Sequence, residues 1–373
     1  MNKRIEDIEC LRAVAVIAVL IHHANGNLFT ALSPGLATFY TYFGGWFGVD
    51  LFFAISGFVI ARDLLPRLAA SASWRETRSL VFSFWLRRAF RLFPAAWLWL
   101  CIILGLCTWF NQSGVFGSWQ ANWEATVAGL LQFANVRFVQ TFGRSEYGVS
   151  FSYWSLSLEE QFYMLLPLLA LLLRRYLAVG LVAIALLQLI SSRDLWMMAF
   201  RTDALALGVL LALWEPSAAY RDIKAWLGAH RAWAMPVQLC VLLGLAFMAS
   251  DAMQHFGLRL GVIAALAVIL VWVASCDLHV FPLGGTVRQV FLWIGARSYG
   301  IYLVHIPVFF VIREILSRTA QSAPVFLASP FILAMAAAIL IAIVSQMNFK
   351  IVELPWRNRG QKLAKWILVS RVI

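Results

Sequence analysis

The sequence predicts an all-α protein, a polytopic transmembrane helical bundle of about ten spans with both termini in the cytoplasm. Of its 373 residues, 62% are hydrophobic and 13% are charged, against about half and about 25% in a soluble domain. The mean hydropathy is +0.79, and 17 tryptophans are available to form belts at the membrane interfaces. This composition excludes an ordinary soluble domain, a disordered chain and a basic nucleic-acid-binding domain.

The apolar segments follow one another along the chain without a visible internal repeat. The first, 8–27, comes after several acidic residues and is not followed by a small-residue cleavage site, so we expect a retained helix rather than a signal peptide. Each later segment is close to the ~20 residues that cross a bilayer. They are expected at 40–61, 92–110, 153–173, 176–192, 198–214, 232–250, 257–275, 289–312 and 328–350.

Positive charge gathers on one side of the predicted bundle. Lys and Arg exceed Asp and Glu by 12. Counted from a cytoplasmic N-terminus, 21 of the 30 basic residues fall on the cytoplasmic side and 7 on the other, while Arg12 and Arg297 lie inside spans. This bias supports an even number of spans with both termini inside, and it explains the net charge without an acidic partner.

Three segments lie outside the predicted spans. Residues 62–91 are expected to form an Arg-rich cytoplasmic loop. Residues 111–152 form an external segment that is nearly uncharged and rich in aromatic rings, which suit either stacking on sugars or embedding in the membrane interface. The basic tail, 354–373, is expected on the cytoplasmic surface, so the chain divides into a membrane domain, 1–353, and this tail. The five cysteines lack a CxxC pair and predict neither disulfides nor a metal site.

Ionisable side chains inside a membrane are costly and are therefore candidates for function. In the first span, Arg12 and His23 are eleven residues apart, which places them on one helix face about 16 Å from each other. Glu9 lies one turn before Arg12 on nearly the same stripe. The structural alternatives are an Arg12 that reaches the interface and a His23 that is only packed inside the bundle.

Charged residues also lie in the later spans. Arg88 and Arg91 precede the third span, where they could bind phosphate or could only anchor the chain at the cytoplasmic face. Arg201 and Asp203 are at the start of the sixth span, and the structural alternative for them is a local ion pair. The remaining candidates are Asp50 and Ser56 in the second span, Glu159, Glu160 and Tyr163 in the fourth, and His305 in the ninth.

These candidates are expected to separate into two groups. Arg12, Arg88 and Arg91 gather at the cytoplasmic end, where guanidinium groups suit a phosphorylated donor. His23 and the carboxylates gather in the outer half, where a histidine beside a carboxylate can act as a general base.

Seven segments together resemble the acyltransferase-3 family of integral-membrane O-acyltransferases. They occur in the family's order and cover nearly the whole chain. The segments are ECLRAVAVIAVLIHH, GVDLFFAISGFVI, LRRAFRLFP, YWSLSLEEQFY, RTDALALGVLLA, ARSYGIYLVHIP and VELPWRNRG.

The resemblance implies transfer of an acyl group, commonly acetyl, from cytoplasmic acyl-CoA to a hydroxyl of a carbohydrate or glycolipid. Acceptors in the family include lipopolysaccharide, exopolysaccharide and peptidoglycan, and some members acylate macrolide-like metabolites. The resemblance also implies that the protein is located in a bacterial inner membrane. Acyl-CoA would be the donor substrate, with no permanently bound cofactor or metal. The residues that match the family's motifs would have functional roles. These are Arg12, His23, Arg88, Arg91, Glu159 and Glu160. The chain departs from the usual pattern in Glu9, where an Asp is common, and in His22 beside His23.

The expected mechanism uses His23 as the base that deprotonates the acceptor hydroxyl, with Asp50 or Glu160 orienting its ring. Because the chain lacks a G-x-S-x-G motif, direct transfer is favoured over a seryl intermediate, and an acyl group on the histidine stays open. We expect no fused hydrolase-like domain, so the chain completes transfer itself or passes the acyl group to a separate protein. The rival class is a transporter or flippase that uses the same intramembrane charges.

Overall fold

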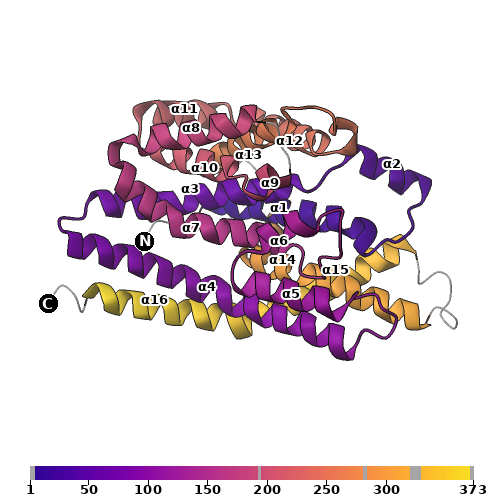
Figure 1. The fold of residues 1–373 in the computed structure, drawn as a ribbon. Helices are drawn as coiled ribbons and strands as arrows, with labels where there is room; N and C mark the ends of the chain where they lie inside the picture. The colour runs from indigo at the N-terminus through magenta and orange to yellow at the C-terminus, as the bar shows by residue number, and fades with distance from the viewer. Residues whose placement is uncertain (1–4, 192–194, 280–283, 320–328, 370–373) are drawn as a thin grey trace. The chain divides into compact units, whose positions relative to one another are not determined.

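The computed structural model describes residues 5–191, 195–279, 284–319 and 329–369, and their regular structure is helical apart from one isolated bridge between Asn25 and Phe29 (Figure 1). This confirms the all-α prediction. Lys3, Arg4, Arg193 and Arg371 lie outside the described residues, as do the ends of two predicted spans, at 192 and 328, and of the tail, at 370–373.

Helices of membrane-spanning length are plentiful in the described part of the chain. Each of the ten predicted segments overlaps a helix, although 40–61 and 198–214 each cross a break between two helices. By length and apolar composition five helical stretches qualify as spans, or six if a pair bent by 105° counts as one. The count of ten spans and the cytoplasmic termini stay predictions. The five stretches are Pro34–Ala69, Trp74–Trp109, Tyr153–Leu189, Gly285–Thr319 and Pro330–Val369.

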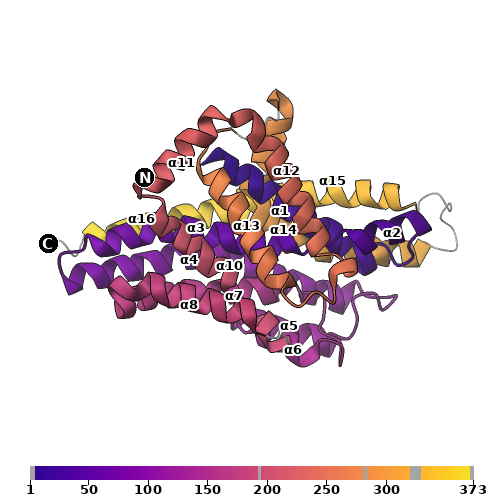
Figure 2. The same cartoon turned by 90° about the horizontal axis from the view of Figure 1, so that it is seen from above.

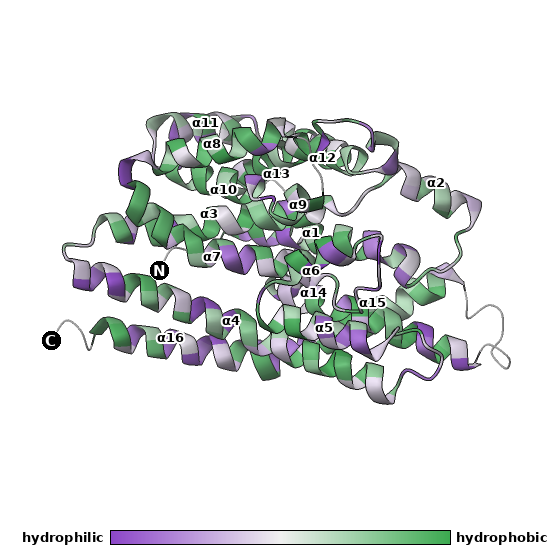
Figure 3. Ribbon diagram, in the orientation of Figure 1, coloured by the Kyte–Doolittle hydropathy of each residue, from purple (hydrophilic) through white to green (hydrophobic). Residues whose placement is uncertain are grey.

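The segment 62–91 is mostly helical and not an irregular loop, while its cytoplasmic location stays a prediction. Helix α3 (Phe47–Ala69) continues past the predicted end of the second span, and α4 (Trp74–Trp109) starts long before the third. A capping box starts α4: Ser73 Oγ accepts from Glu76 N at 3.2 Å, and Glu76 Oε2 accepts from Ala72 N at 2.9 Å. The hydrophilic first half of α4 and its hydrophobic second half are visible in Figure 3.

The chain divides into two compact units. Unit 1 comprises Met1–His22, Leu32–Pro66 and Leu166–Ser298, and unit 2 comprises His23–Ala31, Arg67–Leu165 and Tyr299–Ile373. Three helices besides α3 contribute to both units, namely α1 (Glu6–Asn27), α7 (Tyr153–Leu173) and α14 (Gly285–Thr319). The other helices of unit 1 are α2 (Pro34–Tyr42), α8 (Leu177–Ile190), α9 (Leu195–Ala199), α10 (Asp203–Trp214), α11 (Ala218–Ala229), α12 (Arg231–Met248) and α13 (Arg259–Ser275), with short 3₁₀ turns at Arg174–Tyr176 and Asp251–Met253.

Unit 2 holds the long helix α4 and the C-terminal helices. The segment predicted as an external loop contains two of its helices, α5 (Trp119–Leu130) and α6 (Ala134–Thr141). A π-helical turn, Phe349–Glu353, joins α15 (Pro330–Asn348) to α16 (Leu354–Val369). The predicted basic tail is therefore largely the helix α16.

Helix α16 packs along α4, as Figures 1 and 2 both show. A Cβ added to Gly360 would lie 2.5 Å from Phe90 Cβ, so the two helices approach closely at this glycine. The Phe90 and Trp356 rings are 5.8 Å apart, and Ala364 is buried. One face of this basic helix is thus fixed against the protein, while its interfacial location stays a prediction.

Small residues bring α3 and α10 together in unit 1. A Cβ on Gly57 would lie 2.1 Å from Leu205 O, and one on Gly208 would lie 2.2 Å from Ala54 O. Close backbone approach at small residues is the usual way in which helices associate in membranes, where lipid supplies no hydrophobic drive between them. Asp50 of α3 and Arg201, just before α10, are held near this crossing.

We expect Gly57→Ala to destabilise the protein by about 1–3 kcal/mol, because a methyl group cannot fit against the Leu205 carbonyl without separating the helices. The measurement is the unfolding temperature of the purified protein in detergent. Gly244→Ala on α12 is the matched control, since a Cβ there meets no atom within 4 Å. Equal unfolding temperatures for the two variants would contradict the close crossing.

Candidate functional site

Two histidines form the centre of the candidate site in unit 2. His23 Nδ1 lies 2.8 Å from His305 Nε2, although the residues are 282 positions apart in the chain. Their rings stack at 5.1 Å between centroids with 9° between planes. His305 is completely buried. His23 is partly exposed, so it is the member of the pair that a substrate can reach.

The hydrogen bonds of this pair determine where its protons sit. His305 Nδ1 lies 2.7 Å from the carbonyl oxygen of Tyr302, which can only accept, so Nδ1 carries the proton. His305 Nε2 is then an acceptor when the ring is neutral, and His23 Nδ1 must donate to it. In this assignment from the hydrogen-bond network, His23 Nε2 has no proton. A lone pair on an accessible imidazole is what a general base requires.

Aromatic and hydroxyl groups hold the pair in place. The Phe151 ring meets His23 edge-on at 5.3 Å between centroids. Tyr302 donates its hydroxyl to Ser152 O at 3.1 Å and lies 2.7 Å from Ser155 Oγ. These contacts attach the start of α7 to α14, which carries His305. The sequence marked both histidines, but nothing in it indicated that they are partners.

A second group of charged residues joins α4 to α7 within unit 2. The Arg88 guanidinium lies over the Tyr163 ring at 5.3 Å. Tyr163 donates its hydroxyl to Glu159, although the three-residue spacing had associated it with Glu160. Glu160 is buried, and its Oε2 has no hydrogen-bond partner among the residues that the structure describes. Arg88 and Arg91 lie near enough for their charges to act on it.

The expected separation of arginines and carboxylates into opposite ends of the bundle is therefore wrong for this group. The hydropathy pattern starts the third span only after Arg91. In the structure α4 is already helical at Trp74, so its arginines pack beside the carboxylates of α7. The result is a partly buried cluster in which Arg88 lies over the Tyr163 ring and the charges of Arg88 and Arg91 act on Glu160.

Asp50 makes an ion pair in unit 1. Its Oδ2 lies 3.0 Å from Arg201 Nη2, and each side chain is only 2% exposed. The Arg201 guanidinium also lies over the Trp46 ring at 5.3 Å. The sequence offered a local pair between Arg201 and Asp203, which stays a prediction; Asp203 starts α10 and accepts from Ala204 N at 3.0 Å. Ser56, also predicted in the site, is buried on α3.

Arg12 and Glu9 confirm the predicted stripe on α1. Arg12 Nη1 lies 3.4 Å from Glu9 Oε1, and the arginine side chain is 16% exposed. Both residues belong to unit 1, whereas His23, Arg88 and Arg91 belong to unit 2. The role of Arg12 toward a donor stays a prediction, as does an orienting role for Asp50 toward His23.

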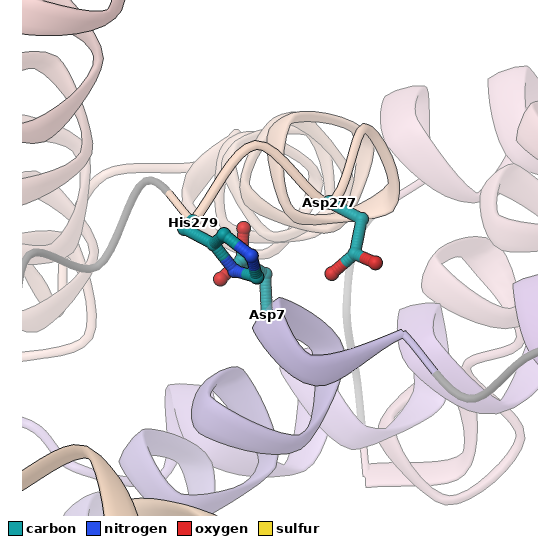
Figure 4. A group of neighbouring side chains, drawn as sticks. All are labelled: Asp7, Asp277 and His279. Carbon is teal, nitrogen blue, oxygen red and sulfur yellow. The ribbon is translucent and has the colours of Figure 1, made fainter.

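Asp7, Asp277 and His279 are the group in the described residues whose ligand atoms come close enough, within 4.8 Å, to hold a metal ion (Figure 4). Their contacts favour a structural role instead. Arg288 Nη2 lies 2.7 Å from His279 Nδ1 and 3.8 Å from Asp7 Oδ1. Asp277 Oδ1 accepts from Glu6 N at 3.1 Å, which caps the start of α1. A guanidinium thus supplies the positive charge of this cluster.

Glu314 is a buried carboxylate that the sequence analysis did not single out. It accepts from the backbone nitrogens of Gln112 and Ser113 at 2.8 and 2.9 Å, from the Ser113 hydroxyl, and from Arg318 Nε at 2.9 Å. These bonds attach the chain after α4 to α14. The sequence did contain a signal for the ion pair, because Glu314 lies four residues before Arg318 and such residues are neighbours on a helix.

Comparison with known proteins places this geometry in context. A family model described as an acyltransferase domain matches residues 5–346. The chain is 27% identical over 381 residues to O-acetyltransferase OatA of Staphylococcus aureus (strain NCTC 8325 / PS 47), with 95% of this chain and 57% of the relative covered. It is 28% identical over 387 residues to peptidoglycan O-acetyltransferase OatA of Listeria monocytogenes, covering 96% and 57%. No solved structure matches.

A third relative is the putative peptidoglycan O-acetyltransferase YrhL of Bacillus subtilis (strain 168), 26% identical over 410 residues, with 100% of this chain and 58% of the relative covered. The chain therefore spans less than two thirds of the length of these curated relatives.

Proposed function

Since the chain belongs to the acyltransferase-3 family of integral-membrane O-acyltransferases, we propose that it transfers an acetyl group from acyl-CoA to a glycan hydroxyl at the bacterial inner membrane. The observation that carries this proposal is the His23–His305 pair, in which a partly exposed histidine is hydrogen-bonded to a buried one. The names of the relatives support a peptidoglycan-like acceptor over a macrolide-like metabolite. Family membership favours an acyltransferase over a transporter.

In the proposed reaction His23 Nε2 removes the proton of the acceptor hydroxyl while that oxygen attacks the thioester carbonyl. The new C–O bond forms, the C–S bond breaks, and the departing thiolate takes the proton from His23, which leaves free CoA and an O-acetyl ester. While His23 is cationic, its Nδ1–H donates to His305. The buried His305 thereby fixes the orientation of the base, a role that the sequence analysis gave to Asp50 or Glu160.

Arg88 and Arg91 are proposed to hold phosphate groups of the donor, and a donor-binding role for Arg12 stays a separate proposal. Guanidinium groups bind phosphates by paired, charge-assisted hydrogen bonds. Glu159 and Glu160 are proposed to balance part of this positive charge when no donor is bound, since the charges of both arginines act on Glu160 and those of both carboxylates act on Arg88. Incoming phosphates would compete with these carboxylates for the same guanidinium groups.

The experiment follows an acetyl label from acetyl-CoA to a soluble glycan with detergent-purified protein. Arg88→Ala and Arg91→Ala are expected to raise the donor KM by about 10–100-fold, the loss typical of a hydrogen bond to a charged group. Arg78→Ala on the same helix is the matched control, because its side chain is exposed. Absence of any label transfer by the wild type would refute the proposed function. An unchanged donor KM in both variants would show that the arginines only anchor the helix.

A further inference from the structure

The aromatic segment between α4 and α7 encloses a pocket that the proposed mechanism has not used. Its volume is about 340 Å³, and all of its lining residues belong to unit 2. This is within the usual size range of small-molecule sites. Six aromatic rings line it, from Phe116, Phe138, Phe142, Tyr147, Phe151 and Phe310.

Two residues that line the pocket contact the proposed base, although His23 itself is not part of the lining. Phe151, which lines it, meets the His23 ring at 5.3 Å. Asn27, on another side of the lining, donates from Nδ2 to His23 O at 2.8 Å. Phe310 lies five residues after His305 on α14. A molecule in the pocket would therefore lie within one residue of His23, beside Phe151 and Asn27.

Hydrogen bonds shape the pocket in advance. Arg137 Nη2 donates to Ala121 O at 3.1 Å and to Tyr147 O at 3.0 Å, which attaches the segment after α6 to α5. Tyr147 in turn donates its hydroxyl to Ala134 O at 3.2 Å. Burial raises the pKa of Tyr147 above its ordinary value, so the hydroxyl stays neutral. The aromatic walls are thus held by an internal framework rather than by a ligand.

The polar groups of the lining narrow the class of ligand. Glu146 lies in the wall with both carboxylate oxygens 3.1 Å from Ser118 N, and Thr141, Ser145 and Asn27 add hydroxyl and amide groups. Aromatic faces with a few such groups fit a sugar ring, whose C–H face is apolar and whose edge carries hydroxyls. A carboxylate in the wall disfavours an anionic ligand. An alkyl chain could not form hydrogen bonds with these polar groups.

We propose that this pocket is the acceptor subsite, in which a neutral pyranose ring, such as an N-acetylhexosamine unit, stacks on the aromatic wall and presents a hydroxyl to His23. The proposal rests on the proposed function, because it names where the acceptor of that reaction binds. It also selects sugar stacking over interfacial embedding as the use of the aromatic rings nearest to His23.

Phe142→Ala tests the subsite. Phe142 is 53% exposed, so its truncation leaves the core of the unit intact. With N,N′-diacetylchitobiose as the probe, we expect sugar binding to the detergent-purified protein, measured by calorimetry, to weaken by about 3–10-fold, the loss of one aromatic stacking contact. The acceptor KM should rise by the same factor.

Trp123→Ala is the matched control. Trp123 is exposed to a similar extent, 46%, and comes from the same aromatic segment but does not line the pocket. Sugar binding that is equal in Phe142→Ala, Trp123→Ala and wild type, or absent from all three, would overturn the subsite. Because binding is measured without chemistry, this result is distinct from a failure of the wild type to transfer acetyl from acetyl-CoA, which would overturn the proposed function itself.

Discussion

Replacing His23 with alanine is expected to lower acetyl transfer by about 10²–10⁴-fold, the usual contribution of a positioned general base. The donor KM should change little, because the donor phosphates are assigned to arginines. The variant should remain folded, since His23 is partly exposed. The measurement is the rate of label transfer from acetyl-CoA at saturating donor, with membrane expression and gel-filtration profile as checks on folding.

Two further variants separate a base from a packed side chain. Added imidazole should partly restore the acetyl-transfer activity of His23→Ala, as expected when only the proton acceptor is lost. His305→Gln keeps an oxygen that can accept from His23 Nδ1, whereas His305→Phe keeps only the ring volume, so Gln should retain more activity. Transfer by His23→Ala near the wild-type rate would refute the assignment of the base. Equal losses in the two His305 variants would show that His305 does not act through the hydrogen bond.

The short-range parts of this site followed from the sequence, whereas its long-range pairings did not. Helical periodicity correctly placed Glu9 beside Arg12, because residues three apart on a helix are neighbours. The partner of His23 comes from the ninth predicted span, 282 residues away. Which helices pack together depends on the whole bundle, so composition and spacing marked His305 as a candidate without showing what it contacts.

Helix length was the other property that hydropathy could not supply. A hydropathy pattern reports which part of a segment suits the membrane interior. In this chain the apolar stretch of the third predicted span begins only after the arginines that precede it. Helix formation depends on propensity and capping, and Ser73 and Glu76 start α4 well before Arg88. The same reasoning explains why the tail was predicted as a surface segment, although α16 packs along α4.

Asp50→Ala is expected to destabilise the protein by about 3–5 kcal/mol, because it removes one partner of a buried ion pair. Both side chains are 2% exposed and 3.0 Å apart. Stacking of Arg201 on Trp46 at 5.3 Å would not replace the lost charge. The measurement is the unfolding temperature in detergent. Asp222→Ala on α11 is the control, since this carboxylate is exposed and its removal should change the unfolding temperature little.

The double variant Asp50→Leu with Arg201→Leu decides between a structural and a catalytic role for Asp50. Replacing both partners of a buried ion pair with apolar side chains removes the cost of desolvating two charges, so the double variant should be far more stable than Asp50→Ala. If it also transfers acetyl at near the wild-type rate, Asp50 does not orient His23, and the hydrogen bond to His305 remains as the orienting contact. A folded double variant without activity would contradict a purely structural role for this ion pair.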